Sequence, residues 1–142
     1  MRRMNDAEIR AFLTFGTRTG KLGVTRLDGS PMVVPIWFAV DEDDTLLFTT
    51  WGKSIKGKSL RRDGRVSLCV DEDEPPYAYV RVDGTTTLHD DPELLRTWAE
   101  RIGGRYMGAE LASQYGARNG VPGELLVRIA PTTIVAQADI AD

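Results

Sequence analysis

Short apolar runs separated by tight turns fill most of this sequence, and they restrict the fold to antiparallel β-structure. The runs predict strands at residues 21–26, 31–40, 45–50, 65–70, 77–88, 124–129 and 132–138. Asp28-Gly29, between the first two strands, is a strong hairpin-turn signal. Strands joined by such turns pair antiparallel, and about six of them with few helices favour a small barrel that closes on itself.

Several local patterns refine this prediction. Residues 31–40, PMVVPIWFAV, are almost continuously apolar, so we expect burial on both faces, with a bulge or a missing ladder bond at Pro35. Gly84 is expected to mark a bulge in the strand 77–88. Helices are predicted at about residues 6–16, after an Asn5 or Asp6 cap, at 54–62, after Asp91-Pro92, and at about 108–118.

Size and composition exclude several classes of protein. The 142 residues carry a net charge of -3 and 42% are hydrophobic, which predicts one domain, residues 1–142, with a real core. No apolar run reaches the ~20 residues of a membrane helix, and the N-terminus lacks the apolar stretch of a secretory signal. The single cysteine, Cys69, excludes an internal disulfide and is expected to be a buried packing residue. A cytoplasmic protein fits these properties, and the acidic total argues against non-specific nucleic-acid binding.

The segment 46–70 is the most informative for function. It reads LLFTTWGKSIKGKSLRRDGRVSLCV, with basic side chains, serines and glycines in the loop between two apolar runs and Asp63 as its only acid. Small residues let backbone approach a ligand, and hydroxyl, amide and ammonium groups bind phosphate. The segment therefore indicates a phosphate site at the end of a strand. The alternative is the solvated face of a short helix, and the segment matches neither the P-loop nor the dinucleotide-binding glycine pattern.

Side chains for acid–base or metal chemistry are scarce. His89 is the only histidine, in a Leu-His-Asp-Asp turn before a helix, and is expected at the surface. No cluster of His, Asp and Glu has the spacing of metal ligands. A protein of this composition is either not an enzyme or takes its chemistry from a cofactor.

A series of short motifs, in a fixed order, resembles a known family. The series contains Gly23-Val24-Thr25, Asp28-Gly29-Ser30-Pro31, VVPIWF at 33–38, Phe48-Thr49-Thr50, Ser54 with Lys56, Leu60-Arg61-Arg62-Asp63, Val82-Asp83-Gly84-Thr85 and Ile129-Ala130-Pro131. This order and spacing resemble the pyridoxamine 5'-phosphate oxidase-like split β-barrel proteins, and more narrowly the actinobacterial flavin/deazaflavin oxidoreductases of the B type. The resemblance covers nearly the whole chain. It implies a mainly β fold with peripheral helices, an antiparallel split β-barrel of the FMN-binding-protein type.

The resemblance also implies a homodimer with cofactor sites at the interface. The tricyclic ring would lie against Val34, Pro35, Ile36 and Trp37, facing Thr49 and Thr50. The phosphate would be held by Ser54 and Lys56, with Lys58 as a further basic contact. Tyr77 and Tyr79 of the partner subunit would approach the site, and Asn119 is a weaker candidate near it. Many relatives carry a second basic residue where this chain has Ile55, and Lys53 or Lys58 would replace that charge. From the residues alone, Ile36 and Trp37 could equally be core, Thr49 and Thr50 ordinary strand residues, and the two tyrosines dimer packing.

Family members bind FMN, the deazaflavin coenzyme F-420 or occasionally haem. The C-terminal residues 136–142 are acidic and lack the basic motif with which pyridoxamine phosphate oxidases bind their substrate phosphate. The apolar strand and the basic loop look most like the deazaflavin-binding group, so F-420 is favoured over FMN. The implied reaction is hydride transfer to an electron-poor double bond of a small-molecule substrate. The alternatives are an FMN-binding oxidoreductase, a non-catalytic cofactor-binding protein, and a nucleic-acid-binding barrel that uses the basic run 53–65.

Overall fold

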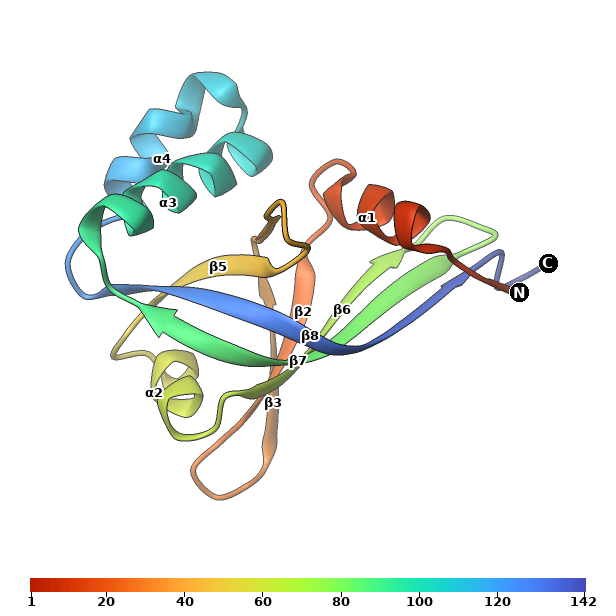
Figure 1. Ribbon diagram of the computed structural model, residues 1–142, viewed down its shortest axis with the longest axis horizontal. Helices are drawn as coiled ribbons and strands as arrows, with labels where there is room; N and C mark the ends of the chain where they lie inside the picture. Colours follow the sequence, from red (N-terminus) through yellow and green to blue (C-terminus); the bar gives the residue numbers. More distant parts are fainter.

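The computed structural model describes residues 1–142 and contains one antiparallel eight-stranded sheet that curls on itself, with four α-helices around it (Figure 1). The strands are β1 (Arg2–Arg3), β2 (Gly20–Thr25), β3 (Pro31–Ile36), β4 (Ala39–Val40), β5 (Leu46–Trp51), β6 (Arg65–Glu72), β7 (Ala78–His89) and β8 (Glu124–Ala138). The helices are α1 (Asp6–Thr14), α2 (Ile55–Arg62), α3 (Pro92–Met107) and α4 (Ala112–Asn119), with a 3-10 turn η1 (Ala109–Leu111) before α4. The predicted split β-barrel is confirmed.

The long strand β8 joins the two halves of the sheet. The strand order is β3-β2-β6-β7-β8-β5-β4, and β1 pairs with β8 outside this path. The second half of β8 pairs with β7, while its first half pairs with both β7 and β5, as in Thr49↔Leu126. β8 therefore lies in the middle of the curled sheet, and β3 and β4 form its ends (Figure 1).

Alternating side chains fill the inside of the curled sheet. On β6 and β7, Leu68 pairs with Val82 and Val70 with Val80, and all four side chains are fully buried. They belong to one core cluster of 18 buried residues. A smaller cluster, Leu47, Leu95, Trp98 and Leu126, joins α3 to the other face of β5 and β8. Burial of apolar area at these positions supplies the main driving force for folding.

The helix caps follow directly from the sequence. Asn5 accepts a hydrogen bond from the Glu8 backbone N–H at 2.9 Å, and the Glu8 carboxylate accepts from the Asn5 N–H at 3.3 Å. Asp91 caps α3, and Pro92 occupies its first turn. α3 and α4 form a hairpin that packs over one end of the sheet (Figure 1). None of the helices has the length and apolar character needed to cross a bilayer.

The prediction for residues 31–40 is wrong in two respects. β3 ends at Ile36, and Pro31, Val33 and Pro35 are exposed rather than buried. β3 is an edge strand, so one of its faces stays open, and Pro35 pairs with Lys21 without a bulge. Since only β2 lies beside β3, the missing N–H of Pro35 interrupts no second ladder.

The two predicted C-terminal strands are one. β8 runs without a turn from Glu124 to Ala138. Its pairing with β7 shifts register between Asp83 and Gly84, where a bulge was expected, and the extra residue, Thr132, lies on β8. A Cβ at Gly84 would lie 2.5 Å from the Ala130 carbonyl oxygen, so the two backbones approach too closely for any side chain. Cys69 is only half-buried, because it alternates with the inward-facing Leu68 and Val70.

Candidate functional site

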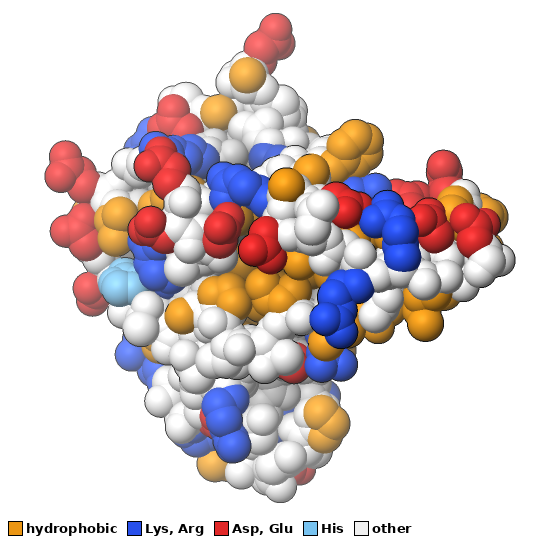
Figure 2. All heavy atoms as spheres, turned by 45° about the vertical axis from the view of Figure 1, so that its right-hand side comes forward, with side chains coloured by type: hydrophobic (Ala, Val, Ile, Leu, Met, Phe, Trp, Pro, Cys, Tyr) orange, Lys and Arg blue, Asp and Glu red, His pale blue; other side chains and the backbone are white.

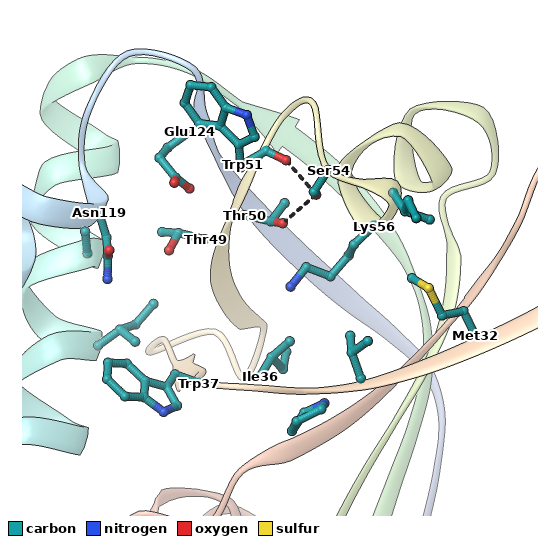
Figure 3. Close-up of a pocket in the computed structure, with 15 residues that line it drawn as sticks. Met32, Ile36, Trp37, Thr49, Thr50, Trp51, Ser54, Lys56, Asn119 and Glu124 are labelled. Atoms are coloured by element: carbon teal, nitrogen blue, oxygen red, sulfur yellow. Dashed lines mark hydrogen bonds between the residues drawn. The ribbon is translucent and has the colours of Figure 1, made fainter.

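A cleft of about 640 Å³ lies between β3, β5, α2 and the α3–α4 hairpin (Figure 3). We call it the β3–β5 cleft. Fifteen residues line it: Met32, Val34, Pro35, Ile36, Trp37, Thr49, Thr50, Trp51, Ser54, Ile55, Lys56, Ala99, Ile102, Asn119 and Glu124. Eight of these are hydrophobic, and the polar ones lie on β5, at the N-terminus of α2, at the start of β8 and at the end of α4. A mostly apolar cleft with a few convergent polar groups is the usual form of a small-molecule site.

The structure brings nine of the twelve predicted cofactor-binding residues to this cleft. They are Val34, Pro35, Ile36, Trp37, Thr49, Thr50, Ser54, Lys56 and Asn119. Lys58 does not line it and is exposed on α2. Tyr77 and Tyr79 do not line it either, and Tyr77 lies beside Phe15 and Arg18 in a separate hollow. Their predicted approach from a partner subunit, like the cofactor roles of the nine, stays a prediction.

The β3 side of the cleft is an apolar wall that ends at an aromatic stack. Met32, Val34 and Ile36 alternate with the exposed positions of the edge strand. The Trp37 ring lies parallel to Tyr106 of α3, with centroids 5.1 Å apart, and 5.7 Å from Tyr115 of α4. Tyr106 is fixed in turn, because its hydroxyl accepts from the Phe38 N–H at 3.2 Å and donates to the Arg18 carbonyl at 2.8 Å. The wall is therefore rigid where a flat ring would lie against it.

The opposite side is the N-terminus of α2, shaped by Ser54. The Ser54 hydroxyl accepts from the Gly57 N–H at 2.9 Å and donates to the Trp51 carbonyl at 2.7 Å. Its proton is engaged, so Ser54 contributes by capping the helix rather than as a free donor. The backbone N–H groups of Ile55 and Lys56 have no partner within the protein. Unpaired N–H groups at a helix N-terminus favour anions.

Lys56 supplies the positive charge of the cleft. Its ammonium points into the cleft (Figure 3) and makes no hydrogen bond or ion pair with the protein. Burial lowers the pKa of Lys56, and the nearby Glu124 opposes this effect. A half-buried ammonium without a partner is available to a ligand anion.

Sequence reasoning missed six of the lining residues: Met32, Trp51, Ile55, Ala99, Ile102 and Glu124. Trp51 and Glu124 face each other only because β5 pairs with β8, a register that no local pattern reveals. The glycine at position 123 was the one signal in the sequence for this contact. In the structure Gly123 has a φ of 97°, and a Cβ there would lie 2.3 Å from the Trp51 ring, so no other residue fits. A glycine between a chain break such as Val121-Pro122 and a strand indicates that another part of the protein packs closely against the backbone there. Here that part is Trp51, at the rim of the cleft.

The chemistry of these side chains is that of a binding site. No group of three or more His, Cys, Asp or Glu side chains is placed to hold a metal ion. The free donors at α2 suit a phosphate, and the apolar wall with Trp37 suits a flat ring, so the residues present fit a phosphate-bearing ring cofactor.

A sheet curled into a half-barrel with helices at its edges defines the split β-barrel class of flavin-binding folds. The chain belongs to the pyridoxamine 5'-phosphate oxidase family, whose profile matches residues 6–138. This confirms the resemblance inferred from the motifs. No curated protein matches the sequence.

Solved structures agree with this assignment. A conserved hypothetical protein from Mycobacterium tuberculosis, Rv2991, is 28% identical over 96% of this chain and 86% of that chain, with a TM-score of 0.84. An F-420 reductase is 24% identical over 87% of this chain and 94% of its own, with a TM-score of 0.69. A FAD-binding protein from Mesorhizobium loti is 24% identical over 95% of this chain and 93% of its own, with a TM-score of 0.71. The last two show a shared fold.

Proposed function

We propose that the protein is an oxidoreductase that binds the deazaflavin coenzyme F-420 in the β3–β5 cleft and reduces an unsaturated small-molecule substrate. One observation carries this proposal: the cleft combines an unpaired ammonium and two free backbone N–H groups at α2 with a rigid apolar wall on β3. A phosphate and a flat ring on one molecule would satisfy both sides.

The protein's own part is binding and orientation. Lys56 and the α2 N-terminus would hold the phosphate, and Val34, Ile36 and Trp37 would support one face of the ring. Bound F-420 supplies the hydride. The apolar side chains of the cleft exclude water from the reacting face and hold the substrate beside it. The shortage of ionisable side chains in the cleft supports chemistry carried by a cofactor rather than by the protein.

Two features favour F-420 over FMN. The acidic residues 136–142 offer no basic motif for a substrate phosphate, and a protein with the same fold is an F-420 reductase. The FMN-binding oxidoreductase is the second candidate, supported by family membership and by the fold shared with a FAD-binding protein. A protein that only binds the cofactor is the third.

Equilibrium titration with F-420 and FMN distinguishes the candidates. We expect micromolar binding of F-420, weaker binding of FMN, and oxidation of reduced F-420 only when an electron-poor alkene or similar acceptor is added. Tight FMN binding without F-420 binding would establish the FMN alternative. Binding of F-420 without oxidation by a panel of acceptors would favour the non-catalytic protein.

We also propose that the protein is a homodimer. Large apolar side chains, among them Leu27, Val33 and Ile134, are exposed. Figure 2 shows an apolar hollow near the centre of one face, with charged side chains above it and to its right. Apolar surface on this scale favours a symmetric interface. Sedimentation at micromolar concentration should give the dimer mass, and a monomer there would exclude it.

A further inference from the structure

The β3–β5 cleft contains one acid for which the proposed function has no role. Of its fifteen lining residues, only Lys56 and Glu124 have ionisable side chains. Glu124 is the first residue of β8 and Lys56 lies in the first turn of α2. Both head groups point into the cleft from neighbouring walls (Figure 3).

The two groups face the same space without touching. Neither makes a hydrogen bond, and no ion pair of up to 4.0 Å joins them. The Glu124 backbone is fixed by a 3.1 Å bond from its N–H to the Val121 carbonyl, but its carboxyl is free. A ligand at Lys56 would therefore lie close to an unpaired carboxyl.

No other charge contributes to this region. α3 presents Ala99 and Ile102 to the cleft, α4 presents Asn119, and β5 presents Thr49, Thr50 and Trp51. The charged Lys53, Arg96 and Arg118, which lie on the surrounding segments, are exposed and do not line it. The protonation of Glu124 is therefore governed by its burial and by Lys56.

These two influences act in opposite directions. Burial raises the pKa of Glu124, and Lys56 lowers it. A ligand anion bound to Lys56 would cancel the effect of the lysine and add a repulsion of its own. Both changes favour the protonated carboxyl.

We propose that Glu124 takes up a proton when an anionic ligand binds beside Lys56, so that ligand binding at the α2 end of the cleft is coupled to the protonation of this carboxyl. This inference rests on the proposed function for its ligand.

Proton uptake can be measured apart from catalysis. Calorimetric titration of F-420 into the wild type and Glu124→Gln, between pH 6 and 8 in two buffers of different ionisation enthalpy, gives the number of protons bound. The ionisation of F-420 itself is common to both proteins. We expect the wild type to take up more protons than Glu124→Gln, and the variant to bind F-420 about three- to tenfold more tightly at the upper end of the pH range. Glu93→Gln, at an exposed position outside the cleft, should behave as the wild type.

A second measurement needs no ligand. Carbon-detected NMR titration of the Glu124 carboxyl in the wild type and in Lys56→Met should show a higher midpoint in the variant, because the lysine is the charge that lowers it. An unchanged midpoint, or equal proton uptake by the wild type and Glu124→Gln, would overturn the inference. Failure of both F-420 and FMN to bind would overturn the proposed function instead, and the NMR titration would still decide whether Glu124 and Lys56 are coupled.

Discussion

Arg105 and Lys56 are both half-buried cations, but only the region around Arg105 provides hydrogen-bond acceptors for its charged group. Arg105, on α3, donates to the carbonyl oxygens of Gly16 at 3.0 Å, Phe38 at 2.8 Å and Leu13 at 2.8 Å. Its guanidinium also lies 4.7 Å from the centroid of the Phe38 ring. Lys56 has no hydrogen-bond partner at all. Burial lowers the pKa of both side chains.

The difference separates a structural cation from one that is available to a ligand. Arg105 joins α3 to the last turn of α1, to the segment after α1 and to the segment before β4. Its donors are satisfied by oxygens that never titrate. The desolvation of Lys56 is offset within the protein only by the nearby Glu124 and by the Phe48 ring, whose centroid lies 5.9 Å from the ammonium. A folded chain tolerates such a group where a ligand completes its contacts. Hydrogen-bond saturation, rather than charge or burial, therefore distinguishes the two regions.

The largest expected effect is on the Arg105 side of this comparison. Arg105→Met should lower the free energy of unfolding by about 3 kcal/mol or more, because three carbonyl groups, two of them in partly buried bonds, lose charge-assisted hydrogen bonds. Urea denaturation measures it. Arg105→Lys, which keeps the charge but not the three-way geometry, should recover only part of the loss. If Arg105→Met has the same free energy of unfolding as the wild type, the three hydrogen bonds do not contribute to stability.

Lys56→Met should have the reverse profile. Cofactor affinity should fall about 10- to 150-fold, from the loss of a charge-assisted bond of about 1.5–3 kcal/mol, while stability without ligand stays within about 0.5 kcal/mol of the wild type. Fluorescence titration and urea denaturation of the same samples test both halves. Unchanged cofactor affinity would mean that Lys56 does not contact the ligand and belongs to a solvated face of α2.

A third buried ion tests how pH enters the comparison. Asp41 pairs with Arg128 and accepts from Thr45 Oγ1 at 2.6 Å and the Asp43 N–H at 3.0 Å. Burial alone would raise the pKa of Asp41, but the hydrogen bonds from Thr45, Asp43 and Arg128 outweigh it and hold the pKa below its ordinary value.

A lowered pKa in the folded state stabilises the fold above the ordinary value, near pH 4, and the contribution disappears as pH falls through the folded value. Asp41→Asn should therefore cost about 1–2 kcal/mol at pH 7 and progressively less below about pH 4. Urea denaturation at a series of pH values gives the difference. The cost of Arg105→Met should stay level over the same range, and a parallel decline would contradict the contrast between titrating and non-titrating partners.

The smallest effect is expected at Lys58. Its side chain lies on the same helix as Lys56 but is exposed and outside the cleft. Lys58→Ala should change cofactor affinity by less than about threefold. A loss as large as that of Lys56→Met, in the same titration, would restore Lys58 to the predicted phosphate site.

Local patterns predicted most of the fold but only part of the cleft. The Asp28-Gly29 hairpin, the Asn5 and Asp91 caps and the bulge at Gly84 were readable because turn and cap chemistry is local. The burial of residues 31–40 on both faces was predicted wrongly, because whether a strand lies at an edge depends on which strands pair. The union of the last two strands was missed for the same reason: β8 absorbs one extra residue, Thr132, opposite Asp83 and Gly84, and Pro131 does not end the strand.

The site shows the same limit. Val34 to Trp37, Thr49 and Lys56 could be grouped because the motifs fall in a familiar order. Glu124 carries no signal of its own, and only the pairing of β5 with β8, which sets Glu124 beside Trp51, brings it to the same cleft as Lys56. A glutamate at the start of a strand is common, so its presence in a cleft has to be seen in three dimensions.

The position of β8 also has a consequence for how the chain is made. β8 follows every other strand in sequence, yet it lies between β7 and β5 in the sheet. On a ribosome, β5 and β7 emerge first, and each waits with an unpaired edge until β8 appears. Their pairings span long stretches of sequence, so closure is a late, non-local step. The nascent protein is therefore most prone to aggregation in the interval between the synthesis of β7 and that of β8.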